Sequence, residues 1–348
     1  MKKKIAIIGS GFFGVTAALI LSKKYEIDLY EKKKTILNGA SKANQMRFHQ
    51  GYHYPRSLET LNEVKKFNKS FIKFYGKDIL GKTNNYYAVS KYNSKTNFNK
   101  FIKFLNNNKL YYKKIKNKNF SNNVSEPILS KEKNLNYFII KKKILTKLKK
   151  SKINLILNKQ IQKKDLVKYN KIIIACYDQN NIVLKNLGIK LKKKYKYELV
   201  EKIIIKLPKK FKKESFMVLD GKFVSLDPYL GTNYHLLSDV KFSKLEVIKS
   251  YFPNFKSAKK KFINKGIIKN IKFSRFNKFI NNSKNYLPFL EKAKYIGSFF
   301  VVRTIEINKE KTDERLNQIV KINKKIITIL SGKWNTSVGL AKKLIYLI

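Results

Sequence analysis

The sequence predicts an α/β fold with an inserted second domain, and three observations lead to this prediction. A short apolar run, a glycine-punctuated turn and an apolar helical stretch follow one another within residues 5–21. The run at residues 171–176, which is apolar throughout after Lys171, is typical of a strand buried inside a parallel sheet. Alternating segments between residues 195 and 238, separated by turn signals such as Asp220-Gly221, indicate an antiparallel sheet of different construction.

The first segment is organised around the turn Gly9-Ser10-Gly11-Phe12-Phe13-Gly14. The apolar run at residues 5–8 precedes this turn, and the helical stretch at 15–21 follows it. A second strand at residues 27–30 ends at the acidic residue Glu31, 22 residues beyond Gly9. The order of strand, G-x-G-x-x-G turn, helix, strand and acid predicts a Rossmann-like dinucleotide site.

Each part of this segment has a physical role in such a site. Gly9 permits a tight turn, Gly11 lets the backbone approach a pyrophosphate, and Gly14 lets the helix pack closely on the strand. The helix N-terminus offers free N–H groups and the positive end of its dipole to phosphates. Glu31 stands where an acid accepts hydrogen bonds from ribose hydroxyls.

The same N-terminal stretch can also be compared with a secretory signal peptide, because lysines at positions 2–4 precede the apolar residues. Glycines at this spacing have no role in a signal peptide, and no small-residue cleavage site precedes the next charges. The stretch is also too short and too rich in glycine and serine for a membrane span. The single cysteine, Cys176, excludes an internal disulfide and fits a reducing compartment, so we expect a cytoplasmic protein.

The formal net charge of +56 invites a nucleic-acid-binding interpretation. However, only five of the 78 basic residues are arginines, so the other 73 are lysines. Lysine, asparagine and isoleucine together are typical of a coding bias toward A and T, and no nucleic-acid-binding motif organises the charge. We expect at most peripheral membrane association and no specific nucleic-acid partner. A non-catalytic nucleotide- or polyanion-binding protein is an alternative that only the charge favours.

The loop after Glu31 is polar, aromatic and glycine-punctuated, which is typical of an ordered functional loop. Two of the five arginines, Arg47 and Arg56, lie in it, with two of the three histidines, His49 and His53, between them. Where lysine has replaced arginine almost everywhere, a remaining arginine indicates a site that needs a planar, bidentate donor.

The other elements follow in chain order. Ser57 caps a helix that we expect near residues 58–74. Further helices are expected to end near residue 106, to span 138–150 and to follow residue 336, and the segment 245–293 is expected to be mostly helical. Strands are expected at 86–90, 153–157, 295–303 and 325–330. With the 348 residues that the chain provides, we predict two domains. The dinucleotide-binding domain is discontinuous and comprises residues 1–80, 150–190 and 295–348, and the substrate domain comprises residues 81–149 and 191–294.

Three segments together resemble the FAD-dependent oxidoreductases of the D-amino-acid-oxidase (DAO) superfamily. They are the glycine turn with Glu31, the loop in which Gly39-Ala40-Ser41 leads to His49-Gln50-Gly51-Tyr52-His53-Tyr54, and the C-terminal turn Gly332-Lys333-Trp334-Asn335-Thr336. The loop is similar to that of glycerol-3-phosphate and L-2-hydroxyglutarate dehydrogenases. Asn335 stands where many relatives carry threonine. The Asn44–Arg47 stretch, with Tyr54-Pro55-Arg56-Ser57 following the loop, is not typical of the amino-acid oxidases, which leaves the substrate open.

The resemblance implies FAD as the cofactor, held by the glycine turn, the loop and the C-terminal turn. The helix N-terminus after the C-terminal turn would stabilise the negative charge that appears at the flavin O2/N1 edge on reduction. The expected cofactor-binding residues are Gly9, Ser10, Gly11, Phe12, Phe13, Gly14, Glu31, Lys32, Ser41, Asn44, Arg47, Gly332, Lys333, Trp334 and Thr336.

The implied reaction is hydride transfer from a CH–OH or CH–NH group of a small acid, amino acid or sugar derivative to flavin N5. His49 is either the base for the substrate proton or a residue that packs against the flavin. His53 and Tyr54 either orient the substrate or pack the loop, and Arg303 binds a substrate anion or forms an ion pair. No metal is expected, and oxygen and a quinone are both open as electron acceptor. A flavin-dependent mutase similar to UDP-galactopyranose mutase is the alternative enzyme.

Overall fold

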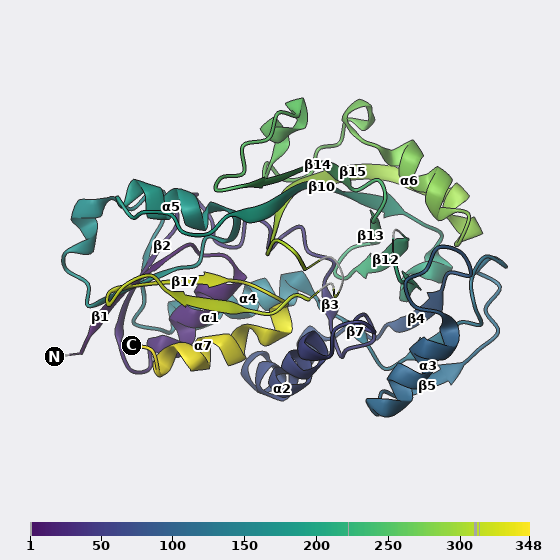
Figure 1. Cartoon of the computed structure of the whole chain (residues 1–348), viewed down its shortest axis with the longest axis horizontal. Coiled ribbons are helices and arrows are strands. Elements are labelled where there is room, and N and C mark those ends of the chain that lie inside the picture. The colour runs from purple at the N-terminus through teal and green to yellow at the C-terminus, as the bar shows by residue number, and fades with distance from the viewer. Residues whose placement is uncertain (1, 222, 310–311, 313) are drawn as a thin grey trace.

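The computed structural model describes residues 2–348 except 222, 310, 311 and 313. Two sheets form its framework, and helices cover their faces (Figure 1). The N- and C-termini lie close together at one end of the molecule, beside the first sheet. Among the described residues, no helix has both the length and the apolar character that crossing a membrane requires.

The first sheet draws its strands from the beginning, the middle and the end of the chain. Its order is β16-β17-β9-β1-β2-β8, and every neighbouring pair is parallel except β16 with β17. The strands are β1 (Lys4–Ile8), β2 (Glu26–Tyr30), β8 (Asn154–Ile156), β9 (Lys171–Ile174), β16 (Gln318–Lys321) and β17 (Ile326–Leu330). The predicted Rossmann-like fold class is therefore confirmed, and strands from both ends and the middle of the chain lie in one sheet.

Helices cover both faces of this sheet. One face carries α1 (Phe12–Leu21), α4 (Tyr137–Lys149) and α7 (Ser337–Ile345), whose apolar residues share one core with β1 and β2. Every residue of α1 is buried, because this helix is apolar on all sides and lies between the sheet and its neighbouring helices. The other face is covered by α5 (Asn180–Asn186).

Three further helices and a pair of short strands lie outside the two large sheets. Helix α2 (Leu58–Tyr75) begins at Ser57, whose Oγ accepts a hydrogen bond from the Thr60 amide at 3.3 Å, so the predicted cap is confirmed. The others are α3 (Phe98–Asn107), α6 (Phe276–Ser283), and the paired short strands β3 (Arg47–Phe48) and β7 (Lys133–Asn134).

The second sheet has nine strands and is mixed, as predicted. Its order is β14-β10-β13-β12-β11-β4-β6-β5, with β15 on the other side of β10, and β4 with β11 is the parallel pair. The strands are β4 (Asn84–Val89), β5 (Tyr112–Lys114), β6 (Ile128–Ser130), β10 (Tyr195–Lys206), β11 (Glu214–Leu219), β12 (Val224–Tyr229), β13 (Tyr234–Asp239), β14 (Lys244–Ser250) and β15 (Lys294–Ile305).

Two details of the predicted organisation differ from the structure. Strand β15, which the sequence prediction placed in the dinucleotide-binding domain, pairs with β10 and so lies in the second sheet. The segment 245–293, expected to be mostly helical, begins with β14 and contains only α6 and short 3-10 helices. Pro253 and Gly266, which has φ +88°, interrupt any long helix there.

Candidate active site

The glycine turn is shaped by the space around it. Gly9 has φ +102° and donates its N–H to Tyr30 O at 2.8 Å, and a Cβ there would lie 2.8 Å from Ala175 O. A Cβ on Gly14 would lie only 1.9 Å from Gly9 O. Neither position can accept a side chain without moving the backbone, so both glycines are needed by the fold of the turn itself.

Gly11 has a different reason to be glycine. It has φ −63°, a value that any residue adopts, and a Cβ there would make an ordinary 3.6 Å contact with Ser41 Oγ. Ser41 Oγ accepts a hydrogen bond from the Phe12 amide at 3.0 Å, which places the loop at the N-terminus of α1. The missing side chain at Gly11 therefore leaves room for a ligand rather than for the protein.

Glu31 is held at the carboxyl end of β2 by the neighbouring backbone. Its Oε2 accepts hydrogen bonds from the Ser10 amide at 3.1 Å and from Ser10 Oγ at 2.8 Å. Its Oε1 accepts a bond from the Lys33 amide at 3.0 Å. The carboxylate is thus fixed beside the glycine turn, where its remaining lone pairs can accept from ribose hydroxyls.

These groups line a first cavity of about 290 Å³. Eleven of the fifteen residues expected to bind the cofactor lie around it: Gly9, Gly11, Phe12, Phe13, Glu31, Lys32, Ser41, Asn44, Gly332 and Trp334 line it directly, and Ser10 holds Glu31. Gly14 supports the turn from behind. Lys333, Arg47 and Thr336 are not in the lining of this cavity.

The sequence prediction missed Asn264, which comes from a distant excursion between β14 and β15 and lines the same cavity. Its Oδ1 is buried and has no hydrogen-bond partner among the described residues. A buried, unsatisfied oxygen in a cavity can pair with a donor on a ligand. Together with the glycine turn and the fixed Glu31, this oxygen makes the cavity suitable for a dinucleotide with its many polar groups.

A second cavity of about 580 Å³ adjoins the first. It lies between the second sheet on one side and the histidine loop and C-terminal turn on the other. The two cavities share seven lining residues, which define their junction: Asn44, Tyr177, Lys202, Arg303, Ser331, Gly332 and Trp334. Trp334 is held there by stacking on Phe12, with ring centroids 3.9 Å apart and planes 5° apart.

The histidine loop gathers three rings beside this junction. The centroids of His49, His53 and Tyr54 are 5.4 to 5.8 Å apart, and Lys333 Nζ lies 5.0 Å from the Tyr54 ring centroid. His49 and His53 line the second cavity, whereas Tyr54 is buried behind them. The expected catalytic residues of the loop are therefore brought together.

The electrostatics around His49 keep its imidazole neutral. Burial and the nearby positive charges, first that of Lys333, lower the pKa of His49 well below its ordinary value of 6.5. The His49 Nδ1 lies 3.8 Å from Glu132 Oε1, and burial raises the pKa of Glu132. A neutral imidazole with a carboxyl group behind it can accept a proton at neutral pH.

The C-terminal turn fixes the backbone of His49. Asn335 Nδ2 donates to His49 O at 2.9 Å, and Asn68 Nδ2 donates to the same oxygen at 3.0 Å. Asn335, which departs from the family pattern, thus ties the final turn to the loop that carries the imidazole. Thr336 does not reach the first cavity, since its Oγ1 donates to Lys333 O at 2.6 Å and stabilises the turn instead.

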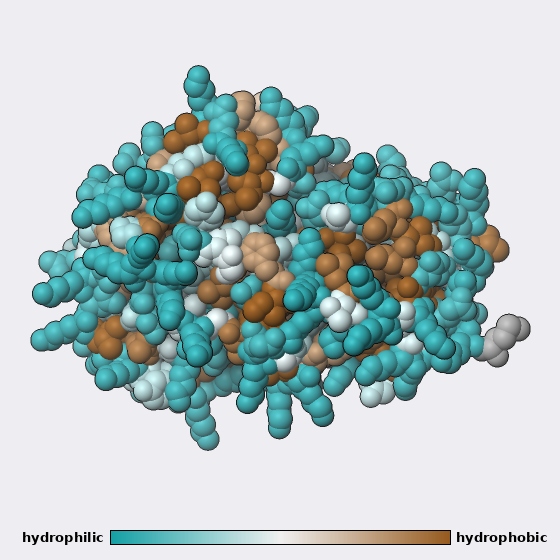
Figure 2. Space-filling view, turned by 180° about the vertical axis from the view of Figure 1, so that it is seen from behind, coloured by the Kyte–Doolittle hydropathy of each residue, from teal (hydrophilic) through white to brown (hydrophobic). Residues whose placement is uncertain are grey.

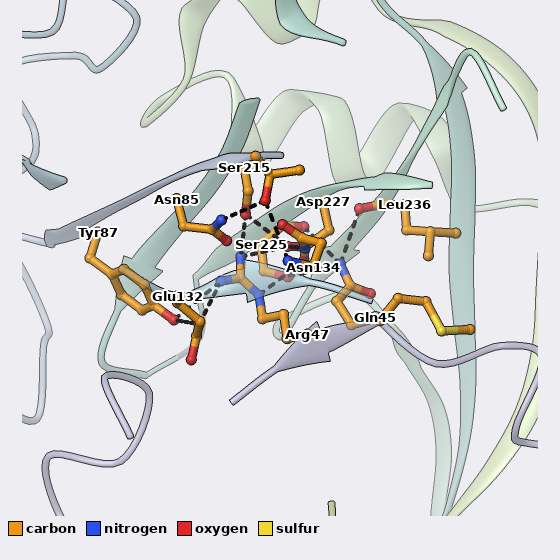
Figure 3. A network of polar contacts seen from close by, with 12 residues as sticks. Gln45, Arg47, Asn85, Tyr87, Glu132, Asn134, Ser215, Ser225, Asp227 and Leu236 are labelled. Atoms are coloured by element: carbon orange, nitrogen blue, oxygen red, sulfur yellow. Dashed lines mark hydrogen bonds and ion pairs between the residues drawn. The ribbon is translucent and has the colours of Figure 1, made fainter. Parts of the chain in front are cut away.

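Arg47 lies in a buried polar network and not along the first cavity (Figure 3). Its Nε and Nη2 lie 3.1 and 2.8 Å from the two oxygens of Asp227, and its Nη1 lies 3.2 Å from Glu132 Oε2. Nη1 also donates to Tyr87 Oη and Nη2 to Ser215 Oγ. The guanidinium thus joins the histidine loop to the second sheet, and the structure gives it a different place from the cofactor contact that we expected.

Four of the five arginines line the second cavity: Arg47, Arg56, Arg303 and Arg315. Arg303 donates from Nε to Glu198 Oε2 at 2.7 Å, while Lys244 Nζ lies 3.2 Å from Glu198 Oε1. Burial opposes the ionisation of Glu198, but Arg303 and Lys244 lower the pKa of this carboxyl. Because the Arg303 side chain keeps 42% of its surface exposed, it can meet a ligand as well as Glu198.

Lys202 is a functional candidate that the sequence prediction missed. It stands on β10 at the junction, and its Nζ donates to Gln45 Oε1 at 3.2 Å. Gln45 is fixed in turn by donating to Ser225 Oγ at 2.9 Å and to Leu236 O at 3.0 Å. Burial, with the charge of Arg303, lowers the pKa of Lys202 to about 8. The sequence signal was weak: Lys202 follows Glu201 and precedes the apolar run at 203–205, in a strand that carries other charged residues.

Comparisons with known proteins agree with this architecture. The family model for FAD-dependent oxidoreductases (DAO) matches residues 4–106. The FAD-dependent monooxygenase FPY4 of Fusarium mangiferae is 31% identical over 98 residues, which are 28% of this chain and 27% of that protein. The FAD-dependent monooxygenase kojA of Aspergillus flavus is 34% identical over 73 residues, or 21% of this chain and 17% of that protein. The matched stretches thus span about a quarter or less of these relatives.

Solved structures share the fold over nearly the whole chain. Glycine oxidase from Geobacillus kaustophilus has a TM-score of 0.68 at 12% identity and covers 99% of this chain and 94% of its own. L-proline dehydrogenase from P. horikoshii has a TM-score of 0.74 at 13% identity, covering 99% and 93%. L-α-glycerophosphate oxidase from Mycoplasma pneumoniae, solved with FAD bound, has a TM-score of 0.71 at 12% identity, covering 100% and 94%.

The fold and the first cavity are those of a dinucleotide-binding protein. Residues 4–106 match the DAO family of FAD-dependent oxidoreductases, in agreement with the resemblance, and the description of this family names FAD as the cofactor. No group of three or more histidine, cysteine, aspartate or glutamate side chains within the described part of the chain is placed to hold a metal ion.

Proposed function

We propose that the protein is a dehydrogenase or oxidase that removes hydride from a CH–OH or CH–NH group of a small acid, amino acid or sugar derivative. The observation that carries this proposal is the junction of the two cavities. The first cavity, which is suited to a dinucleotide, meets the second cavity there, and the second cavity contains the neutral imidazole of His49 and the partly exposed guanidinium of Arg303. When bound, FAD supplies the hydride acceptor at its N5.

The residues that would hold FAD fall into two groups. Gly11 and the N-terminal end of α1 would lie at the pyrophosphate, and Glu31 and Asn264 would offer oxygens to hydroxyl or amino donors. Gly332 and Trp334 lie at the junction, where the C-terminal turn leads into α7. The positive end of this helix favours negative charge at the junction.

His49 is the proposed acceptor of the substrate proton. Its pKa, lowered by burial and neighbouring cations, keeps the ring unprotonated at neutral pH, so it is in the form that a base requires. Glu132 lies behind Nδ1 and can stabilise the imidazolium that forms. Asn335 and Asn68 hold the His49 backbone, so the ring is presented from a fixed position.

The cations of the second cavity support an acidic substrate. Arg303 presents a planar donor, and Lys244 stands beside it on the Glu198 carboxylate, so cationic groups line this wall of the second cavity. A substrate carboxylate or phosphate would be attracted to them. Lys202, protonated below about pH 8, adds positive charge at the junction and favours an anionic species bound beside it.

The solved structures of similar fold bear names that agree with this substrate class, since they include a glycine oxidase, a proline dehydrogenase and a glycerophosphate oxidase. We extend that class to this chain as part of the proposal. A cytoplasmic location also belongs to the proposal, and the single cysteine supports it.

An anaerobic substrate screen tests the proposal. The FAD-loaded protein is mixed with amino acids, 2-hydroxy acids, sugar acids and phosphate esters, and the flavin absorption is followed. Loss of the oxidised flavin spectrum with a member of these classes is the expected result. A mutase would convert a sugar nucleotide without net flavin reduction, and this outcome would replace the proposed reaction. Readmitting oxygen or a quinone then identifies the electron acceptor.

A further inference from the structure

An exposed segment between β14 and β15 combines lysines with apolar side chains. Residues 256–273 contain seven lysines among 18 positions and no aspartate or glutamate, whereas lysine makes up 73 of the 348 residues of the chain. We name these residues the lysine–isoleucine segment. Three large apolar side chains in it face solvent, with 40% of Ile267, 47% of Ile271 and 36% of Phe273 exposed.

The segment is held in place by the second sheet. Ile263 and Ile268 form β-bridges with Phe300 and Ser298, on the edge of β15 that does not contact β10. Tyr295 Oη donates to Ile268 O at 3.0 Å, and the Phe262 ring packs 5.4 Å from the Phe300 ring. The exposed apolar side chains therefore project from an anchored backbone.

The carboxylates nearest this surface are engaged by the chain. Glu246 accepts hydrogen bonds from the amides of Lys256 and Ser257 at 3.0 and 2.8 Å. Glu201 is fully buried and accepts from the amide of Arg275 at 3.0 Å. Glu201 is buried, and both oxygens of the half-exposed Glu246 accept from backbone amides, so lysines dominate the charge around the apolar groups of this segment. Figure 2 shows that apolar areas bordered by hydrophilic residues occur on the surface of the molecule.

We propose that the lysine–isoleucine segment docks the protein on an anionic lipid bilayer. Lysines without carboxylates select a negatively charged partner, which disfavours a second copy of a chain whose net charge is +56. Contact with the phosphate backbone of a nucleic acid buries little apolar surface of an isoleucine side chain. The boundary between lipid headgroups and acyl chains buries this surface and so stabilises the contact. Charge and apolar exposure together therefore fit a lipid surface better than a nucleic acid.

The inference is independent of the proposed reaction, since it uses no residue of the second cavity. Asn264, which lines the first cavity, lies within the same segment, so docking would bring the FAD-binding side of the molecule to the membrane surface. The contact would be peripheral, with the lysines at the headgroups and Ile267, Ile271 and Phe273 inserted between them.

Vesicle co-sedimentation tests the proposal with the full-length, FAD-loaded protein. The vesicles contain phosphatidylcholine alone or phosphatidylcholine with phosphatidylglycerol, and the salt concentration is varied. We expect binding to the anionic vesicles only. The double variant Ile271→Asn with Phe273→Ser should bind about tenfold more weakly at constant charge, since it removes two apolar groups from the lipid interface.

Matched variants separate a local surface from the general field of the protein. Lys260→Glu, Lys261→Glu and Lys265→Glu together should abolish binding, whereas Lys149→Glu, Lys150→Glu and Lys152→Glu, which change the net charge equally on another exposed surface, should reduce it far less. Thermal unfolding and flavin content show that each variant is folded.

Three outcomes would overturn the proposal. One is an absence of binding to anionic vesicles. Another is a result that shows nonspecific attraction to charge. Such a result is equal loss of vesicle binding in the two triple-lysine variants, or unchanged vesicle binding of the variant that changes Ile271 and Phe273. The third is binding of a homopolymeric RNA that depends on Ile271 and Phe273 and competes with the vesicles, which would identify a nucleic acid as the partner.

Discussion

The two cavities that meet at the junction are built in different ways. The first is framed largely by one continuous stretch, from β1 through the glycine turn to Ser41, and its key contacts are made by backbone groups. The second is assembled from the histidine loop, six strands of the second sheet and the C-terminal turn. Its key groups are side chains of opposite charge that come from distant positions, such as Arg47 with Asp227 and Arg303 with Glu198.

This difference explains why the cofactor is easier to infer than the substrate. A backbone cradle depends on glycine spacing and a helix N-terminus, which any member of the fold can keep while the rest of the chain changes. The second cavity is lined by charged side chains from separate strands, so the substitution of one such side chain can change which substrate it binds. The predictions below compare the two regions, from the largest expected effect to the smallest.

Gly14→Ala should be the most damaging single change in the first cavity. The new Cβ would lie 1.9 Å from Gly9 O, which is backbone and cannot move aside without opening the turn. We expect a loss of more than about 4 kcal/mol of stability or failure to fold, measured by chemical unfolding.

Gly11→Ala is the matched control. Its Cβ would meet only Ser41 Oγ at 3.6 Å, so the protein should fold normally but bind FAD roughly tenfold more weakly, about 1.4 kcal/mol. Normal FAD affinity in a folded Gly11→Ala protein would contradict the placement of the pyrophosphate at this residue.

Arg47→Met should destabilise the protein by about 3–5 kcal/mol, because it leaves Asp227 and Glu132 buried without their cation. Arg275→Met is the control, since the Arg275 guanidinium donates to two backbone carbonyls, Phe242 O and Lys244 O, and forms no ion pair with a buried carboxylate among the described residues. Equilibrium denaturation measures both. If the Arg47→Met protein stays stable and loses only its FAD binding, Arg47 contacts the cofactor, as the sequence predicted.

His49→Gln should lower kcat by about 10²–10⁴-fold while FAD binding is kept, as expected for loss of a general base. His53→Gln is the control and should have a smaller effect.

In the wild type, kcat/KM should stay level as the pH falls from 8 to 6.5 and decline only well below 6.5, because the neutral, active form of His49 persists to its lowered pKa. An acid limb centred at 6.5 would contradict the buried, cation-surrounded environment of this ring.

Glu198→Gln and Arg303→Lys test the substrate end, where the effects are smallest. Removing the Glu198 carboxylate takes one negative charge from beside Arg303 and Lys244, so KM for an anionic substrate should fall. Arg303→Lys loses the planar fork, and KM should rise by about tenfold with kcat nearly unchanged. Steady-state kinetics on the substrate found in the screen measures both, and unchanged KM values would mean that this ion pair is only structural.

Much of the first region could be predicted because its signals are local. The order of apolar runs, glycines and Glu31 identified β1, α1 and β2, and the C-terminal turn identified the start of α7. Asn264 could not be predicted, because it reaches the cavity only through the bridges of its segment to β15.

The second region was predictable in part. The scarcity of arginine pointed correctly to residues around one cavity, but it could not say that Arg47 pairs with Glu132 and Asp227, which lie 85 and 180 residues away in the chain. Lys202 and Glu198 were missed because their role depends on how β10 pairs with β14 and β15. Strand pairing over such distances leaves no periodic signal in the sequence.

The most direct test of the account is the visible absorption spectrum of the purified protein, recorded with and without added FAD and again after acid precipitation. The account predicts an oxidised flavin spectrum with one FAD per chain, weakened in Gly11→Ala. A well-folded protein that stays colourless in excess FAD would contradict the assignment of the first cavity, and with it the proposed reaction.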